Sequence, residues 1–281
     1  MDLEFSRVRS TDELLDGLSD PGARILCGGT DLLVKMRGGQ VRPTRLLDVA
    51  DLPALRGLKW SADWLEVGAA EPYADLLADR AIRERLPILA LVLEKLGSVQ
   101  IRSRGTLGGN LVNASPAADS VIALLLLDAE LTLTSLQGDR SLAVERFLLG
   151  PGKTALAQGE FVRLVRIPIP DAPLTPYFHK IGRRKALTIA IASLGALLRV
   201  RKGRVEEARL AAGSVAPTPL RLRRVEELLH ERELTDDLIE EARTLAAQSV
   251  SPIDDVRASG TYRREVTADL VARLLGEFLH V

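Results

Sequence analysis

The sequence predicts a globular protein that mixes helices and strands, and three observations lead to this class. Short apolar runs of strand length alternate with segments whose apolar residues recur every three or four positions, as in amphipathic helices. A glycine turn connects one strand–helix pair, and a second glycine-rich stretch precedes a later helical segment. The 281 residues are 46% apolar and 27% charged, which is enough apolar material for packed cores. At roughly 100–200 residues per domain, this length predicts about two domains.

The first fifty residues predict helix, strand, helix and strand. The pattern Ser-Thr-Asp-Glu at 10–13 is a capping box that opens a short helix. Residues 23–27 predict a buried strand that runs through the turn 28–31 into a helix over 32–36. Residues 46–49 predict a second strand.

The central part predicts a longer helix between shorter elements. Residues 64–69 predict a strand, followed by a helix from about Pro72. Residues 81–96 carry one apolar stripe at helical spacing, although Pro87 can kink or split this helix. The remaining central elements are, in order, the glycine-rich stretch 105–110, a helix over 122–127 and a strand over 129–134.

The composition changes after four prolines at positions 168–176, which are the best linker candidate. Residues 199–210 predict a hairpin whose turn is Arg201-Lys202-Gly203-Arg204. Three helical segments complete the chain, over about 221–232, 236–248 and 260–279.

Charge and cysteine content exclude several classes of protein. The 38 basic residues balance 38 acidic ones, which disfavours electrostatic binding to nucleic acid or to membrane surfaces. Cys27 is the single cysteine, so the chain has no internal disulfide, no cysteine-held iron–sulfur cluster and no cysteine-based zinc site. The three histidines lack metal-ligand spacing. The start lacks a signal-peptide pattern, and the longest apolar run, 121–127, is too short to span a bilayer, so we expect a cytoplasmic protein.

The charges are unevenly placed along the chain. Residues 163–224 hold fourteen Lys and Arg against three Asp and Glu, whereas residues 226–241 hold eight acidic residues against one Arg. One interpretation is solvated faces that offset each other. The other is a docking surface for another subunit.

Two glycine-rich stretches are the strongest candidates for a binding site. A phosphate group needs backbone N–H donors, and glycine permits close approach because it has no Cβ. The stretches 28–31 and 106–110 both follow an apolar segment and precede a helical one. Two such loops favour a ligand with two phosphates, such as a dinucleotide. Neither loop is a Rossmann G-x-G-x-x-G, and the stretch 150–154 lacks the first glycine of a P-loop.

These segments resemble the FAD-binding (medium) subunit of the molybdenum hydroxylase family, of the carbon monoxide dehydrogenase and xanthine dehydrogenase type. The likeness covers nearly the whole chain in the right order. The similar segments are ILCGGTDLLVKMR at 25–37, IRSRGTLGGNLVNASPAAD at 101–119, VRLVRIP at 162–168, FHKIGRR at 178–184, AGSVAPTP at 212–219 and DVRASGTYRR at 255–264.

The resemblance implies the α+β fold class, with a two-subdomain FAD-binding fold of the vanillyl-alcohol-oxidase (PCMH) type. A C-terminal domain with a three-stranded antiparallel sheet and helices would follow it. The implied boundaries are 1–172 for the FAD-binding domain, with subdomains about 1–52 and 53–172, and 173–281 for the C-terminal domain. Members that bind a [4Fe–4S] cluster carry an insert of several cysteines, which a chain with one cysteine does not have.

The resemblance also implies which residues contact FAD. The contacts carried over by position are Leu26, Cys27, Gly28, Gly29, Thr30, Asp31, Leu32, Thr106, Gly108, Gly109, Asn110, Asn113, Ala118, Asp119, Val162 and Lys180. The two glycine stretches would line the pyrophosphate and adenosine, and Val162 with Lys180 or His179 would lie near the flavin. Tyr177 is a candidate for stacking on the isoalloxazine. Cys27 and His179 also fit ordinary packing roles, and Asp119 fits a helix-dipole role.

The function implied by the resemblance is electron transfer. Electrons from [2Fe–2S] clusters on a small partner subunit would pass through FAD to an external acceptor, while a large molybdopterin subunit would hydroxylate the substrate. A dimer of such heterotrimers is expected, with no metal and no catalytic acid or base in this chain. Two alternatives remain: a self-sufficient FAD-dependent oxidase or dehydrogenase, and a non-catalytic nucleotide-binding assembly protein.

Overall fold

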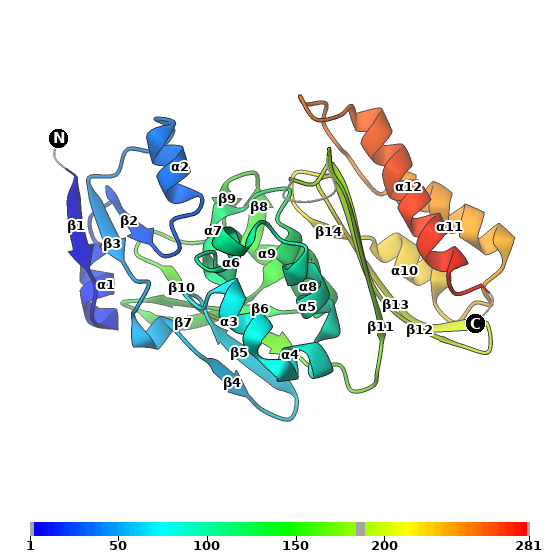
Figure 1. Cartoon of the computed structure of the whole chain (residues 1–281), viewed down its shortest axis with the longest axis horizontal. Helices are drawn as coiled ribbons and strands as arrows, with labels where there is room; N and C mark the ends of the chain where they lie inside the picture. The colour runs from blue at the N-terminus through cyan, green and yellow to red at the C-terminus, as the bar shows by residue number, and fades with distance from the viewer. Residues whose placement is uncertain (1–2, 184–188, 280–281) are drawn as a thin grey trace. The chain divides into compact units, whose positions relative to one another are not determined.

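A computed structural model describes residues 3–183 and 189–279 of the chain (Figure 1). Arg184, the last residue of the similar segment 178–184, lies outside the described residues. The chain divides into two compact units that interleave in sequence. Unit 1 comprises Met1–Asp79, Ser98–Ala114 and Asp128–Ile169; unit 2 comprises Arg80–Gly97, Ser115–Leu127 and Pro170–Val281.

Unit 1 begins with a small parallel sheet. Its strands lie in the order β1 (Glu4–Arg7), β3 (Arg45–Asp48) and β2 (Ala23–Leu26). Helix α1 (Thr11–Gly17) follows the predicted capping box, since the Ser10 side chain accepts a hydrogen bond from Glu13 N at 3.1 Å. Leu14 and Leu47 are fully buried in the core of this part.

A second, antiparallel sheet forms the rest of unit 1. Its strands lie in the order β4 (Leu58–Trp60), β5 (Trp64–Gly68), β10 (Phe161–Pro168), β6 (Glu130–Ser135) and β7 (Gly138–Ala143). Helix α7 (Leu107–Asn113) contacts β10. The smaller elements of the unit are α2 (Leu32–Arg37), η1 (Pro53–Leu55), α3 (Tyr73–Ala78), α6 (Val99–Arg102), α9 (Val144–Phe147), β8 (Leu148–Gly150) and β9 (Lys153–Thr154).

Unit 2 is organised around an antiparallel sheet. The long strands lie in the order β11 (Thr175–Ile181), β12 (Ala192–Arg201) and β13 (Arg204–Gly213), which confirms the three-stranded antiparallel sheet. The two-residue strand β14 (Leu220–Arg221) extends it at the β13 edge. The predicted hairpin turn is also confirmed, because Lys202 and Gly203 both have positive φ, +51° and +75°, as a type I′ turn requires.

Helices cover both faces of this sheet (Figure 1). Helix α8 (Asp119–Leu126) contacts β12 and β13 on one face, where Gly195 and Gly213 leave room for the side chain of Ile122. Helix α5 (Pro87–Glu94) packs beside α8. Pro87 splits the predicted 81–96 helix, since α4 (Arg80–Arg85) ends before it.

The other face of the sheet is covered by the C-terminal helices (Figure 1). These are α10 (Arg223–Leu229), α11 (Asp236–Gln248) and α12 (Gly260–Gly276). The bounds of α11 match the prediction, whereas α10 and α12 are shorter than predicted. Alternate residues of β12, such as Leu194 and Ala196, point into the core beneath these helices.

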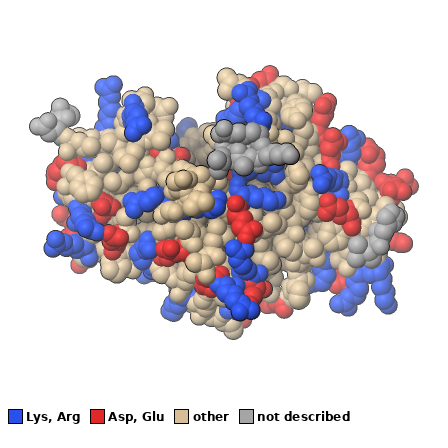
Figure 2. Space-filling model, viewed as in Figure 1, with Lys and Arg blue, Asp and Glu red and all other residues tan. Residues whose placement is uncertain are grey.

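Ion pairs within the chain neutralise several basic residues of the 163–224 segment. Arg166 pairs with Glu66 at 2.7 Å, Arg199 with Glu207 at 2.7 Å, and Arg221 with Glu226 at 2.6 Å. Acidic and basic side chains are interspersed on the face shown in Figure 2. These pairs favour the interpretation of faces that offset each other. Among the described residues, every helix is too short or too polar to cross a lipid bilayer.

Candidate functional site

The first glycine stretch connects β2 to α2 in unit 1. A Cβ on Gly28 would lie 1.9 Å from the carbonyl oxygen of Arg104, so only glycine allows this approach. Gly29 has a φ of +74°, a conformation that side chains disfavour. Asp31 stands at the N-cap of α2 but makes no side-chain capping bond within the described chain. Leu33 N donates to the carbonyl oxygen of Gly29 at 3.3 Å, so within the described chain the N–H groups of Leu32 and Val34 are the ones left for a ligand.

The second glycine stretch is the first turn of α7, not a loop before a helix as the sequence predicted. Thr106 is the N-cap, and its Oγ1 accepts a hydrogen bond from Gly109 N at 3.0 Å. A Cβ on Gly108 would lie 2.6 Å from Ala69, so this glycine lets α7 pack closely on the strand end. Gly109 is exposed, and a Cβ there would meet only Thr106 Oγ1, at 3.1 Å. The surface above Gly109 is thus open.

Three contacts hold the two stretches together. The backbone carbonyl of Arg104 packs against Gly28, and Cys27 Sγ lies 3.6 Å from Thr106 Oγ1. Lys35 Nζ, on α2, donates a hydrogen bond to Asn113 Oδ1 on α7 at 2.5 Å. Lys35 and Arg104 were not predicted. The one signal in the sequence that could have indicated Lys35 is its position one helical turn after Asp31, which puts both residues on the same face of the helix.

Two of the predicted contacts of unit 1, Cys27 and Val162, have packing surroundings. Burial raises the pKa of the Cys27 thiol, which fits a packing role better than a reactive thiolate. Val162 is buried in β10, where the register with β6 shifts just after it. Since α7 contacts β10, Val162 lies in the sheet that supports the second stretch.

A separate polar cluster lies in unit 2. Ala118 is the residue before α8 and Asp119 is its first residue. Lys180 Nζ, on β11, binds Asp119 Oδ2 at 2.8 Å and the carbonyl oxygen of Lys95 at 2.7 Å. The Asp119 and Lys180 side chains are 9% and 10% exposed. Lys95 was not predicted, because 85 residues separate it from Lys180.

The Asp119 carboxylate is only partly satisfied. Its Oδ1 is buried and has no hydrogen-bond partner among the described residues. Burial raises the pKa of Asp119, and the nearby Lys180 ammonium opposes that rise. Such a buried, unpaired acceptor is costly unless a ligand donates to it.

Tyr177 and His179 lie on the opposite face of β11 from Lys180, because alternate strand residues point to opposite faces. Tyr177 packs against the core beneath the C-terminal helices and stacks with His179 at a centroid distance of 6.4 Å. Burial lowers the pKa of His179, and the charge of Arg273 on α12 lowers it further. In this structure neither ring shares a face with the Asp119–Lys180 pair.

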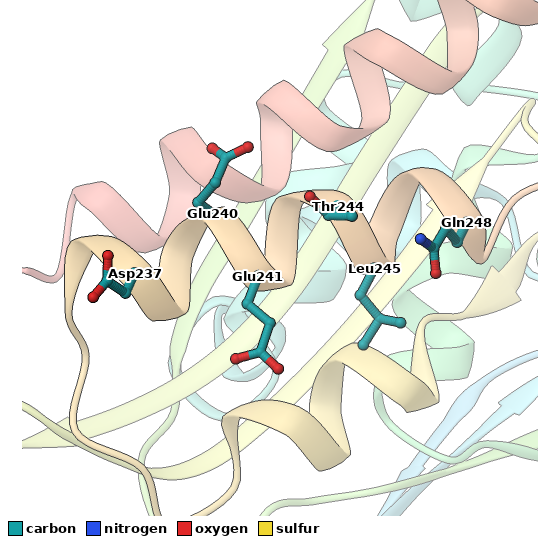
Figure 3. Close-up of a pocket in the computed structure, with 6 residues that line it drawn as sticks. All are labelled: Asp237, Glu240, Glu241, Thr244, Leu245 and Gln248. Atoms are coloured by element: carbon teal, nitrogen blue, oxygen red, sulfur yellow. The ribbon is translucent and has the colours of Figure 1, made fainter.

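The surface of α11 carries a hollow of about 500 Å³ (Figure 3). Its lining residues are Asp237, Glu240, Glu241, Thr244, Leu245 and Gln248. This helix covers the sheet face opposite α8 and Asp119. Three carboxylates would repel an anionic ligand. The hollow is therefore unrelated to the phosphate-type chemistry of the glycine stretches.

Comparison with known proteins decides the family. A family model described as the FAD binding domain in molybdopterin dehydrogenase matches residues 1–170. A second model, the CO dehydrogenase flavoprotein C-terminal domain, matches residues 177–278. The chain belongs to the FAD-binding, or medium, subunits of the molybdenum hydroxylase family.

Individual relatives of this FAD-binding subunit are similar over their whole length. It is 32% identical to the glyceraldehyde dehydrogenase medium chain of Sulfolobus acidocaldarius over 277 residues, 98% of each chain. It is 29% identical to the xanthine dehydrogenase FAD-binding subunit of Escherichia coli O157:H7, covering 97% of this chain and 94% of that one. The structure of carbon monoxide dehydrogenase from Hydrogenophaga pseudoflava matches with a TM-score of 0.93 and 27% identity, covering 97% of this chain and 96% of that chain.

The chain is therefore an oxidoreductase subunit whose cofactor is FAD, and its residues fit that group. The start of α2 has no side-chain cap and offers N–H donors to an anionic pyrophosphate, and the Lys35 ammonium brings a positive charge to the contact between α2 and α7. The open surface at Gly109 admits close approach. In unit 2, Asp119 Oδ1 can accept a hydrogen bond from a hydroxyl or imide N–H, groups that FAD also carries.

We expect Thr106→Ala to lower the free energy of unfolding by about 0.5–2 kcal/mol, because α7 loses its N-cap. FAD affinity should fall as well, since the same side chain fixes Gly109. Urea unfolding and FAD titration measure both effects. Thr106→Ser keeps the hydroxyl and should resemble wild type. Equal stability of the alanine variant would show that the cap contributes nothing.

Proposed function

We propose that this subunit transfers electrons within a larger complex. FAD bound to it would receive them from [2Fe–2S] clusters of a small partner subunit and release them to an external acceptor. A large partner subunit would hold the molybdopterin cofactor and hydroxylate the substrate. The expected assembly is a dimer of heterotrimers, in the cytoplasm.

The observation that carries this proposal is the joining of two distant glycine stretches into one surface of unit 1. Gly28 and Gly109 belong to stretches about 80 residues apart in sequence, yet direct side-chain contacts connect them. One phosphate needs only one such loop, so two loops support a cofactor with a pyrophosphate. We propose that FAD contacts are made by Leu26 to Leu32, Thr106, Gly108, Gly109, Asn110, Asn113, Ala118, Asp119, Val162 and Lys180.

The residues of this chain bind and orient the cofactor, whereas FAD itself supplies the redox chemistry when bound. The N-terminal turn of α2 would hold the pyrophosphate. Lys180 would hold the Asp119 carboxylate with one oxygen directed to a cofactor donor. No proton transfer by a side chain is needed for this role, so we assign no catalytic acid or base.

The cysteine count supports an external source of electrons. Two [2Fe–2S] clusters need about eight cysteine ligands. This chain has one cysteine, Cys27, in contact with Thr106. The clusters that reduce FAD would therefore be held by another chain.

We expect the purified chain with FAD alone to show no oxidation of an aldehyde, an aromatic heterocycle or carbon monoxide. Its complex with two other subunits should oxidise a substrate of one of these kinds. Native mass spectrometry, metal analysis and cofactor chromatography of the complex isolated from its own cells should show molybdenum, iron and FAD together.

The control is the isolated chain reconstituted with FAD, assayed under the same conditions. A stable monomer that turns over a substrate would overturn the proposal in favour of a self-sufficient flavin oxidase or dehydrogenase. A native complex whose bound flavin is never reduced would favour the assembly-protein alternative.

A further inference from the structure

Two lysine side chains join the end of α5 to the strand β11, and their bonds run in opposite directions. Lys95 Nζ donates to the carbonyl oxygen of Phe178 at 2.7 Å. Lys180 Nζ donates to the carbonyl oxygen of Lys95, also at 2.7 Å. We name this pair of bonds the lysine bracket. Lys95 is the C-cap residue that directly follows α5, so the bracket fixes a helix end to a strand.

The lysine bracket is connected to the Asp119 carboxylate through Lys180. Lys180 Nζ binds Asp119 Oδ2 at 2.8 Å, and both side chains are about nine-tenths buried. An ammonium group has three N–H donors, and the bonds to Lys95 and Asp119 use two of them. Asp119 Oδ1 remains without a partner among the described residues. The pair thus presents an unused acceptor beside an ammonium.

A lysine needs an external constraint to hold such a geometry, since its four-carbon stem is flexible. The carbonyl oxygen of Lys95 supplies this constraint directly. The Lys95 side chain secures it in turn, by its bond to Phe178 and by the position of Nζ 5.6 Å from the centroid of the Phe178 ring. The like charges of Lys95 and Lys180 repel each other, so the bracket is maintained by these bonds and not by charge attraction.

We propose that Lys95 is a positioning residue of the cofactor site. The lysine bracket fixes Lys180, and through Lys180 it fixes the Asp119 carboxylate so that Oδ1 accepts a hydrogen bond from FAD. The donor is a hydroxyl or imide N–H of the cofactor. This inference rests on the proposed assignment of Asp119 and Lys180 to the FAD site.

The first test needs no cofactor. Lys95→Met keeps most of the stem but removes the bond to Phe178. In the full chain without FAD, we expect an amine-acylating reagent to modify Lys180 about tenfold faster in this variant, as the loss of one hydrogen bond worth about 1.4 kcal/mol would allow. Peptide mass spectrometry follows the labelling rate. Lys95→Arg should restore protection, and Lys202→Met, in the exposed β12–β13 turn, should match wild type.

The second test measures FAD binding by the same variants. Lys95→Met should weaken FAD affinity about tenfold, with unchanged circular dichroism, and Lys95→Arg should recover most of it. Lys180 is the charged group that acts on the pKa of Asp119, and the charged groups that act on Lys95 are Lys180 and Glu94. A displaced Lys180 stabilises the carboxylate less, so Asp119 takes up a proton at higher pH. FAD binding by Lys95→Met should therefore be lost at a higher pH as the solution is acidified.

Equal labelling of Lys180 in wild type and Lys95→Met would overturn the inference, because the bracket would then not hold Lys180. Faster labelling with unchanged FAD affinity and unchanged acid dependence would overturn it too. Failure of the wild-type chain to bind FAD would contradict the proposed cofactor contacts instead, and the labelling comparison separates the two cases.

Discussion

Replacing Gly109 with aspartate is expected to abolish FAD binding and to leave the chain folded. The new side chain has space, because a Cβ at this exposed position meets only Thr106 Oγ1. Its carboxylate would stand where the pyrophosphate is proposed to lie. Two unit charges 4 Å apart repel by about 4 kcal/mol near a protein surface, which is roughly a thousandfold in affinity. Flavin absorbance after gel filtration and circular dichroism measure the two outcomes.

The position of Gly109 within α7 means that aspartate there should not destabilise the helix. Gly109 is the third residue after the N-cap Thr106, and an acidic side chain in the first helical turn stabilises a helix. Gly109→Asn, of nearly equal size but uncharged, is the matched control and should lose much less affinity. A normal FAD content in Gly109→Asp would remove the second glycine stretch from the site.

Replacing Arg263 with methionine is expected to lower the free energy of unfolding by about 2–6 kcal/mol, because two buried carbonyl oxygens lose a donor at a cost of about 1–3 kcal/mol each. Arg263 is 3% exposed. Its guanidinium donates to the carbonyl oxygens of Ile191 and Ser214 at 2.9 and 2.8 Å, and to Asp255 Oδ1 at 2.6 Å. Ser214 has a φ of +65°, so this bond also holds a strained residue. Urea unfolding of the full chain measures the loss.

The control is Arg243→Met, which removes an exposed pairing with Asp269 and Glu240 and should leave the unfolding midpoint unchanged. Burial alone would raise the pKa of Asp255, but hydrogen bonds from Arg257 N and Arg263 outweigh it, and the pKa is lowered. The stabilisation is therefore complete above the ordinary pKa of aspartate and is lost as the pH falls through the lowered value. The difference between wild type and Arg263→Met should shrink in acid; a constant difference would exclude Asp255 as the cause.

Local patterns predicted the elements whose signals lie within a few residues. The capping box at Ser10, the hairpin turn at Lys202–Gly203 and the helix 236–248 all formed as expected. Residues 107–110 were wrongly predicted as part of a loop, because glycine lowers helix propensity. The N-cap Thr106 and the packing of Gly108 on Ala69 outweigh that cost.

The candidate site was predictable only in its glycine stretches and, through the family resemblance, in Asp119 and Lys180. Lys35 and Lys95 were not identified, because their partners lie 78 and 83 residues away in sequence and no local spacing marks them. Tyr177 was an aromatic candidate for the flavin by position alone. Its place on the face toward the C-terminal core depends on strand register, which sequence position alone does not fix.

The interleaving of the two units affects how this chain emerges from the ribosome. Helix α8 is complete after residue 126, but the strands that cover Ile122 and Leu126 are β12 and β13, made more than sixty residues later. Synthesis proceeds at roughly 5–20 residues per second, so the apolar face of α8 stays without its native cover for several seconds. The apolar face of α8 is therefore an aggregation hazard for the nascent chain until β12 and β13 have been made.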